Sequence, residues 1–337
     1  MARLFFVLIV ALGLAPGTWW RSPYGPEHVD DRPILAVEAL RFPGCRFGEV
    51  EIVGAWQLSS PNWHFSGYSA LLAMDDGTLL AMTDWGRMLK LTPPDAGHRA
   101  APQFGYFATL EDGDKHFRDL EAVTRDPSSG RIWGAYENSN LIERYDARLR
   151  PDGRVAPAPM QGWPTNTGPE SIVRLGDGRF VVLSEGSPRW FAADLPALIF
   201  AGDPVEGARA QPFRFRPPES YRPVDTALLP DGRVLILLRR LVLGLPPRFE
   251  AKLVVADPAE IRPGERWRGR EIAHLADPAP MDNYEGLAVA PGEGGALVLW
   301  LISDDNKATF QRTLLLKLVW RPNEPNEKAR ELPRAPS

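Results

Sequence analysis

Residues 119–138 read Asp-Leu-Glu-Ala-Val-Thr-Arg-Asp-Pro-Ser-Ser-Gly-Arg-Ile-Trp-Gly-Ala-Tyr-Glu-Asn. Two apolar runs, 120–123 and 132–136, are separated by a Ser129-Gly130 turn. Glycine supplies the positive φ angle of a tight turn, so this pattern predicts a β-hairpin. Polar residues stand at the beginning of the first run and just after the second. In an antiparallel hairpin these two ends lie at the same edge of the sheet.

The same unit occurs five times, at intervals of about 50 to 60 residues. Its copies centre on Ser69, Glu121, Glu170, Asp225 and Glu285, and each is followed by a glycine-containing turn and an apolar strand. Weaker third and fourth strands follow in the fourth copy, at 251–255 and 270–275. Repeats of this length, each a four-stranded antiparallel meander, are typical of a β-propeller.

The sequence therefore predicts an all-β protein, a β-propeller of five blades counted from the repeats, with a sixth blade left open. The last unit lacks a fourth strand, whereas residues 50–58 alternate like a strand that has no neighbour. Pairing this N-terminal strand with the C-terminal blade would close the ring and remove an exposed sheet edge. A β-sandwich or two small β-domains are the alternatives.

Domain boundaries follow from composition. Residues 1–20 contain Arg3 followed by an apolar run at 4–15, which predicts a signal peptide or an N-terminal anchor; a buried helix is the alternative. Residues 21–48 are expected to form an irregular leader, 49–322 the propeller, and 323–337 a disordered tail. We therefore expect an exported protein, periplasmic or secreted, whose only membrane contact would be the N-terminal anchor.

The charge balance excludes one class of partner. The chain of 337 residues has 39 Lys and Arg against 43 Asp and Glu, a net charge of -4. Nucleic-acid binding, which needs a clustered basic face, is not expected. The single Cys45 cannot form a disulfide within the chain. The sequence does not indicate an oligomeric state.

One face of the predicted disk is rich in polar residues, because every blade presents both ends of its hairpin there. The ends of the second strands add further polar residues to the five central ones: Asp84, Glu137-Asn138, Glu185, Arg239-Arg240 and 303–306. Loops that enter the blades add 115–119, Asn166 and Arg222. These residues are expected to converge on one site.

The acidic residues of this face are candidates for metal binding. Because the innermost strands line the axis, Glu121, Glu170, Asp225 and Glu285, joined by Asp305, could surround a cation. An all-oxygen set favours Ca²⁺ as the cofactor, if one is present. Some of these acids could instead only accept backbone hydrogen bonds. Glu121, Glu285 and Asp304 are the candidate catalytic residues.

The remaining polar residues of this face suggest the second partner, an anionic small molecule. Its candidate ligands are His116, Arg118, Asn138, Arg239 and Arg240. Acids for a metal and bases for an anion suit metal-assisted hydrolysis of a phosphoester or ester. Arg240 could alternatively only neutralise Asp225 or Glu285. A Gly-x-Ser-x-Gly nucleophile motif and a His-Glu-x-x-His motif are both absent.

Four motifs resemble the phytase-like family, described as having the esterase-like activity of phytase. They are residues 119–123 (Asp-Leu-Glu-Ala-Val), 168–172 (Gly-Pro-Glu-Ser-Ile), 283–287 (Asn-Tyr-Glu-Gly-Leu) and 301–306 (Leu-Ile-Ser-Asp-Asp-Asn). The resemblance covers about 47–320 and implies an exported bacterial propeller with hydrolase activity on phosphoesters or esters. Related propeller phytases have six blades and use calcium, whereas five repeats are counted here. A non-catalytic periplasmic ligand-binding or scaffold propeller and a lactonase-like metal propeller are the alternatives, so enzyme activity stays open.

Overall fold

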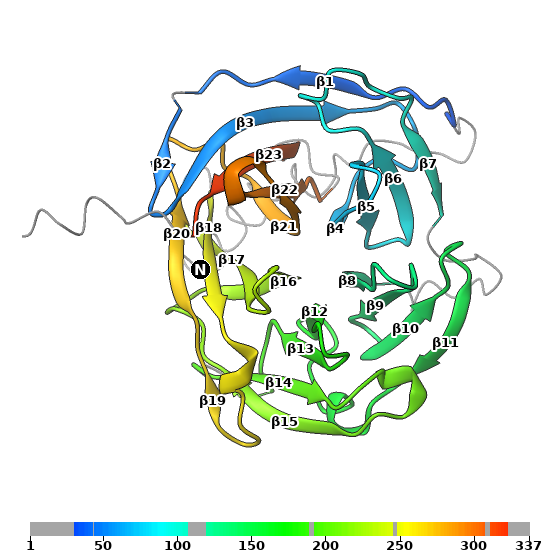
Figure 1. Cartoon of the computed structure of the whole chain (residues 1–337), viewed down its shortest axis with the longest axis vertical. Helices are drawn as coiled ribbons and strands as arrows, with labels where there is room; N and C mark the ends of the chain where they lie inside the picture. Colours follow the sequence, from blue (N-terminus) through cyan, green and yellow to red (C-terminus); the bar gives the residue numbers. More distant parts are fainter. Residues whose placement is uncertain are drawn as a thin grey trace, which may run out of the picture.

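The computed structural model describes residues 30–42, 44–106, 119–188, 192–244, 248–306 and 311–322. These residues form five sheets arranged around a central axis (Figure 1). The all-β prediction and the count of five blades are therefore confirmed. The expected signal peptide or anchor at 1–20, the tail at 323–337, and the candidate residues His116 and Arg118 lie outside the described residues. Export consequently stays a prediction.

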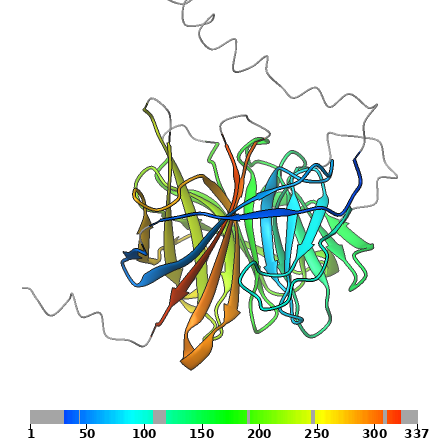
Figure 2. The same cartoon turned by 90° about the horizontal axis from the view of Figure 1, so that it is seen from above.

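In four of the five blades the strands follow one another from the axis outward (Figure 1). Seen edge-on, most strands run roughly along the axis of the ring (Figure 2). The first blade contains β4 (Tyr68–Ala73), β5 (Leu79–Thr83), β6 (Arg87–Leu91) and β7 (Gln103–Tyr106). The second contains β8 (Leu120–Arg125), β9 (Ile132–Tyr136), β10 (Leu141–Tyr145) and β11 (Pro151–Val155). The third contains β12 (Pro169–Arg174), β13 (Phe180–Ser184), β14 (Leu195–Phe200) and β15 (Ala210–Phe215), to which β19 (Arg266–Trp267) adds in parallel. The fourth contains β16 (Arg222–Leu228), β17 (Val234–Val242), β18 (Arg248–Ala256) and β20 (Arg270–Leu275).

The fifth blade combines strands from both ends of the described chain. It contains β21 (Asn283–Pro291), β22 (Leu297–Asp304), β23 (Thr313–Trp320) and β3 (Val50–Ser59). β3 pairs with β23 in antiparallel fashion, from Val50 opposite Trp320 to Leu58 opposite Thr313. The N-terminal strand thus lies beside the last strand of the chain, with 254 residues between Leu58 and Thr313 in the sequence.

The segment before β3 is more regular than the expected leader. β1 (Ala36–Ala39) pairs with β3 from Ala36 opposite Ser59 to Ala39 opposite Trp56, and β2 (Arg46–Phe47) pairs with its beginning. In Figure 1, β1 lies outside β3 at the rim of the disk. Because an outer strand presents unpaired backbone groups, pairing with β1 covers an edge that β3 would otherwise expose. The prediction of an irregular leader is therefore wrong for these two stretches.

Helical structure within the described residues is limited to short 3₁₀ turns. They are η2 (Ala158–Met160), η3 (Pro204–Glu206), η4 (Pro258–Glu260) and η5 (Glu293–Gly295). Asp203 and Asp257 cap η3 and η4, each by accepting a backbone N–H two residues later. Over the part of the chain that is described, no helix has the length and apolarity needed to cross a membrane.

The hydrophobic core lies between neighbouring blades. Val181 and Leu183 of β13 and Ile236 and Leu238 of β17 belong to one buried cluster. The same arrangement joins the second and third blades, where Trp133 packs edge-on against Phe180 with ring centroids 5.0 Å apart. Both faces of each blade are covered, which explains why the second strand of each repeat is almost entirely apolar.

Each innermost strand has the same irregularity, a shift in its pairing register close to its beginning. Along β8, Leu120 lies opposite Tyr136 and Ala122 opposite Ala135, so Glu121 is an extra residue without a partner. A β-bulge of this kind bends the strand and redirects a side chain. The extra residues of the five blades are Ser69, Glu121, Glu170, Val224 and Glu285.

The bulge corrects the sequence alignment in the fourth blade. In β16, Pro223 lies opposite Leu238 and Asp225 opposite Leu237, so the residue equivalent to Glu121 is Val224. A shift of one residue moves a side chain to the other face of a strand. Asp225 accordingly is 1% exposed and accepts the backbone N–H groups of Thr226 and Leu287, each at 2.7 Å. Asp225 links the inner strands of the fourth and fifth blades.

Asp225→Ala is expected to lower the free energy of unfolding by about 1 to 3 kcal/mol, because the buried N–H of Leu287 would lose its acceptor. Urea denaturation followed by circular dichroism measures the change. Asp225→Asn keeps the shape and one acceptor oxygen and should cost less. A loss below about 0.5 kcal/mol for the alanine variant would show that this link between blades is not important for stability.

Candidate functional site

A pocket of about 540 Å³ lies where the five inner strands converge, and every blade contributes to its wall. The described residues of its lining are strongly acidic, with eight carboxyl groups against three guanidinium groups. The acids are Asp84, Asp119, Glu121, Glu137, Glu170, Glu185, Glu285 and Asp304, and the bases are Arg222, Arg239 and Arg240. This convergence of strand ends is the one that the repeat predicted.

Three equivalent positions in each blade supply most of this wall. The first is the bulge residue of the inner strand. The second position is two residues before the bulge residue. The third position is the residue of the blade's second strand that pairs with the second position. In the second blade, for example, the N–H of Glu137 donates to the carbonyl oxygen of Asp119 at 2.8 Å. In the order of the blades, the second position holds Gly67, Asp119, Gly168, Arg222 and Asn283, and the third holds Asp84, Glu137, Glu185, Arg239 and Asp304.

The fourth blade differs from the other four at all three positions. It has Val224 where three blades have glutamate, and Arg239 where all four others have a carboxylic acid. It also has Arg222 where the others have Gly, Asp or Asn. The pocket is therefore asymmetric, with acidic walls on four blades and a basic wall on the fourth.

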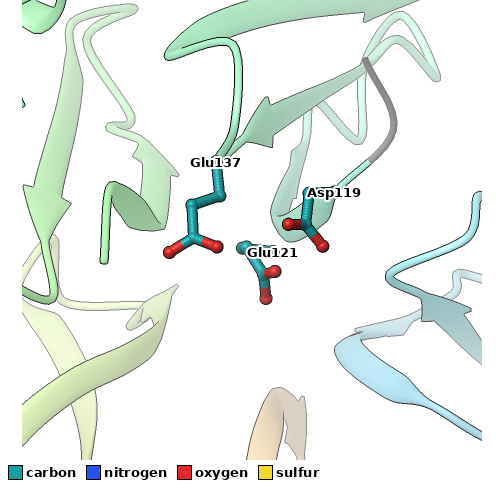
Figure 3. Close-up of side chains that lie close together, drawn as sticks. All are labelled: Asp119, Glu121 and Glu137. Atoms are coloured by element: carbon teal, nitrogen blue, oxygen red, sulfur yellow. The ribbon is translucent and has the colours of Figure 1, made fainter. Parts of the chain in front are cut away.

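The densest group of acids is on the second blade. One carboxylate oxygen from each of Asp119, Glu121 and Glu137 lies within 4.8 Å of the others, and the three side chains turn toward a common space (Figure 3). Asn138 donates to Asp119 at 2.6 Å, and the N–H of Gly168 donates to Glu137 at 3.1 Å. Asn138, predicted to bind substrate, thus orients an acid of this group.

Burial and mutual repulsion shift the titration of these acids. Burial raises the pKa of Glu121 well above its usual value, and the charges of Glu170 and Glu285 raise it further. Burial also raises the pKa of Glu170 well above its usual value, with Glu185 adding to the effect and Arg239 opposing it. Burial raises the pKa of Glu137 to about 7, although the hydrogen bond from the N–H of Gly168 opposes this rise. The group cannot ionise fully near neutral pH without a balancing positive charge.

The stability of the metal-free protein is expected to fall as the pH rises from about 5 to 8. These carboxyl groups hold their protons to a higher pH in the folded state than in the unfolded state. Unfolding therefore releases protons in this range. Each such group lowers the free energy of unfolding by up to about 1.4 kcal/mol for every unit that the pH rises. Urea denaturation in EDTA at pH 5, 6, 7 and 8 measures the slope. Glu121→Gln should flatten it, and a slope that is zero or positive would contradict the buried-acid interpretation.

The three arginines of the basic wall have different surroundings. Arg239 bonds to Glu285, to Oδ1 of Asn283 at 2.7 Å and to Glu185 at 3.1 Å. Burial lowers the pKa of Arg239, but Glu285 and Glu185 raise it by more, so this residue stays charged. Arg240 pairs with Glu250 at 2.6 Å near the rim. Among the described residues, no carboxylate lies within salt-bridge distance of Arg222.

Two of the three candidate residues of the fifth blade line the pocket, and the third does not. Glu285 and Asp304 line the pocket, and Oδ1 of Asp304 accepts the N–H of Asn306 at 2.7 Å. Burial raises the pKa of Asp304 well above its usual value, and Glu285 adds to the effect. Asp305 does not line the pocket, because its carboxylate accepts Oγ of Ser66 at 2.5 Å and Oγ1 of Thr313 at 3.1 Å. Asp225 does not line it either.

Five charged residues line the pocket although they are not among the candidate ligands and catalytic groups of the sequence analysis. They are Asp84, Asp119, Glu137, Glu185 and Arg222. Their positions at strand ends could have indicated them. Each is either the residue two positions before a bulge or the residue that pairs with it. Position relative to the bulge is thus a better guide than residue type.

A family model described as phytase-like, "Esterase-like activity of phytase", matches residues 64–307. The search of curated proteins returned no match. Among solved structures, a luciferin-regenerating enzyme is 10% identical, with a TM-score of 0.45 over 86% of this chain and 96% of that one. A chain of a nidogen/laminin complex is 10% identical, with a TM-score of 0.41 over 83% and 96%. The WD40 β-propeller domain of Doa1 is 10% identical, with a TM-score of 0.35 over 82% and 98%.

Proposed function

Because the chain belongs to the phytase-like family, we propose that it is a hydrolase that cleaves a phosphoester or carboxyl ester bond in the central pocket. The observation that carries this proposal is the asymmetry of the pocket. Four blades contribute acids to it, and the fourth blade contributes Arg222, Arg239 and Arg240. An anionic ester could be held at the basic wall while its reacting bond faces the acids.

The acids of the second blade suit a hard divalent cation. Asp119, Glu121 and Glu137 offer three carboxylate oxygens close together, and no histidine or cysteine is among the described residues that line the pocket. Oxygen-only donor sets favour Ca²⁺ or Mg²⁺ over Zn²⁺. We therefore propose Ca²⁺ at these residues, where it would polarise the bond under attack. Asp225 and Asp305 are left out of this site, because both bond to other parts of the protein.

The basic wall would bind and orient the anion. Arg222 is the strongest candidate for direct contact, because its charge has no acidic partner among the described residues, unlike those of Arg239 and Arg240. Arg239 has a different role in this proposal. Bonded to Glu285 and Glu185, it keeps the acids around it from repelling one another.

Two acids of the fifth blade are suited to the proton transfers. Burial raises the pKa of Glu285, but Arg239 and Asn283 both donate to its carboxylate and oppose this rise. Glu285 is therefore the more readily ionised of the two acids and would act as the base toward water. Asp304 accepts the N–H of Asn306 but is more strongly influenced by burial and by Glu285, which favour its protonated form. A pair of acids in opposite protonation states is the arrangement that general acid and base catalysis requires. Asp304 would donate the proton to the leaving oxygen.

A substrate panel tests this function. Purified protein is incubated with and without CaCl₂ and offered phosphomonoesters, carboxyl esters and lactones. We expect turnover of a phosphomonoester or carboxyl ester that depends on Ca²⁺ and is lost in Glu121→Gln. Turnover of lactones alone would identify a lactonase-like propeller. Binding of an anion without any turnover would identify a non-catalytic binding propeller, and either result would contradict the proposal.

A further inference from the structure

The hairpin of the fourth blade extends past the blade's inner strand. β16 pairs with β17 as far as Arg222 opposite Arg239, whereas β17 and β18 remain paired up to Val242 opposite Arg248. Residues 240–242 and 248–250 therefore form a two-stranded extension, which we call the arm. In the described part of the other four blades, the second and third strands stop pairing at or before the last residue that pairs with the inner strand. In the third blade, for example, β13 and β14 pair only to Leu183 opposite Ala197, whereas β12 pairs on to Pro169 opposite Ser184.

The arm is part of the pocket wall. Arg240, Leu241 and Phe249 all line the pocket. Leu241 lies directly opposite Phe249, and Arg240 lies directly opposite Glu250. Because successive residues of a strand point to opposite faces, the apolar pair shares its face with Arg239, and the ion pair lies on the other face. Over the part of the chain that the structure describes, the pocket lining includes no other large apolar side chain.

This apolar pair remains in contact with water. Leu241 is 51% exposed and Phe249 is partly buried, although most other apolar residues of the blades are packed between sheets. Exposed apolar side chains at the edge of a polar pocket are more informative than apolar residues in general, because burying them with a ligand would be favourable. Arg222 also lines the pocket, and it pairs with Arg239 on the face of the hairpin that carries Leu241 and Phe249. One ligand could therefore contact the charged and the apolar groups together.

We propose that the pocket selects an amphiphilic anion, an ester or phosphoester whose alkyl or aryl group packs against Leu241 and Phe249 while its charged group faces Arg222. This inference rests on the proposed use of the pocket for an anionic ester and specifies the class of that ester. A ligand that carries only charged groups, by contrast, would leave the apolar pair in water. Leu241 and Phe249 are thus the specificity-determining residues of the arm.

Calorimetric titration of the full chain in CaCl₂ with methyl phosphate and with hexyl phosphate measures the preference directly. We expect hexyl phosphate to bind at least about tenfold more tightly, since each methylene covered by the arm adds about three- to fourfold in affinity. The double variant Leu241→Ser/Phe249→Ser should reduce this ratio to about threefold or less. Thermal melting of each variant shows that it is folded.

Leu243→Ser is the matched control, because Leu243 is just past the arm, is 86% exposed and does not line the pocket. It should keep the wild-type ratio. Equal affinities for the two phosphates, binding of neither, or an equal loss in the control variant would overturn the inference. The same samples are assayed for cleavage of p-nitrophenyl esters and phosphates. A preserved hexyl preference without any cleavage would support the amphiphilic ligand and contradict only the hydrolase function.

Discussion

Arg239→Met is expected to lower the free energy of unfolding by about 3 to 5 kcal/mol at pH 8, the cost of removing one partner from a buried ion pair. The Arg239 side chain is 21% exposed, and it forms ion pairs with two carboxylates that are also mostly buried. The side chain of Glu285 is 12% exposed and that of Glu185 is 14% exposed. Without the guanidinium group, these carboxylates would face Glu121 and Glu170 with no compensating charge. The loss should be smaller at pH 5, where the acids can take up protons instead.

Urea denaturation at both pH values measures this effect, and two further variants test its cause. Arg240→Met removes the neighbouring guanidinium, whose side chain is 34% exposed and pairs with Glu250 at the rim. That exposed pair should be worth only about 0 to 1 kcal/mol. The double variant Arg239→Met/Glu285→Gln should recover part of the loss, since the unpaired charge is then removed. Equal losses for Arg239→Met and Arg240→Met would contradict the role given to Arg239.

Glu285→Gln and Asp304→Asn should each lower kcat by about 10²- to 10⁴-fold on the substrate that the panel identifies, because each removes one proton-transfer group. Glutamine keeps the shape of Glu285 and an oxygen for Arg239 but cannot accept the proton of water. Asparagine cannot supply the proton that Asp304 would give to the leaving oxygen. Steady-state kinetics in saturating CaCl₂ separates kcat from KM.

Asp282→Asn provides the control for these two variants. Asp282 is a buried acid at the beginning of the same blade, and it accepts the backbone N–H groups of Asn283 and Arg312 without lining the pocket. Its kcat should stay within about threefold of the wild-type value, provided that the variant is folded. If Asp282→Asn were as damaging as Asp304→Asn, the losses would reflect general disturbance of the fifth blade.

The blades and the location of the pocket could be predicted from the sequence because both depend on local patterns. Each hairpin is a pair of apolar runs around a glycine turn, as in residues 119–138, and the ends of such a hairpin meet wherever the strand pairs antiparallel. The five copies therefore indicate both the ring and its polar face. β1 was not predicted because its segment is short and interrupted by a polar residue. It forms a strand by pairing with the edge of β3, which lies elsewhere in the sequence.

The fourth blade shows what the pattern could not reveal. Asp225 is the acid nearest to the expected position, but the bulge makes Val224 the equivalent of Glu121. A bulge changes the pairing without changing the alternation of residue types, so counting along the strand misplaces the side chain by one. Pairing backward from Arg239 to Arg222 gives the correct register. The two ion pairs of Arg239 join residues 46 and 54 positions apart, and only the assembled ring brings them together.

Calcium binding is the most direct test of the central claim, that the five blades assemble one pocket whose surplus of acids holds a divalent cation. Calorimetric titration of metal-free protein with CaCl₂ at pH 6.5, in two buffers of different ionisation enthalpy, measures both the stoichiometry and the protons released. We predict about one Ca²⁺ per chain with release of protons, because carboxyl groups must lose their protons to coordinate a metal. Glu121→Gln/Glu137→Gln should abolish this binding. The absence of Ca²⁺ binding, or binding that releases no protons and persists in the double variant, would contradict the claim.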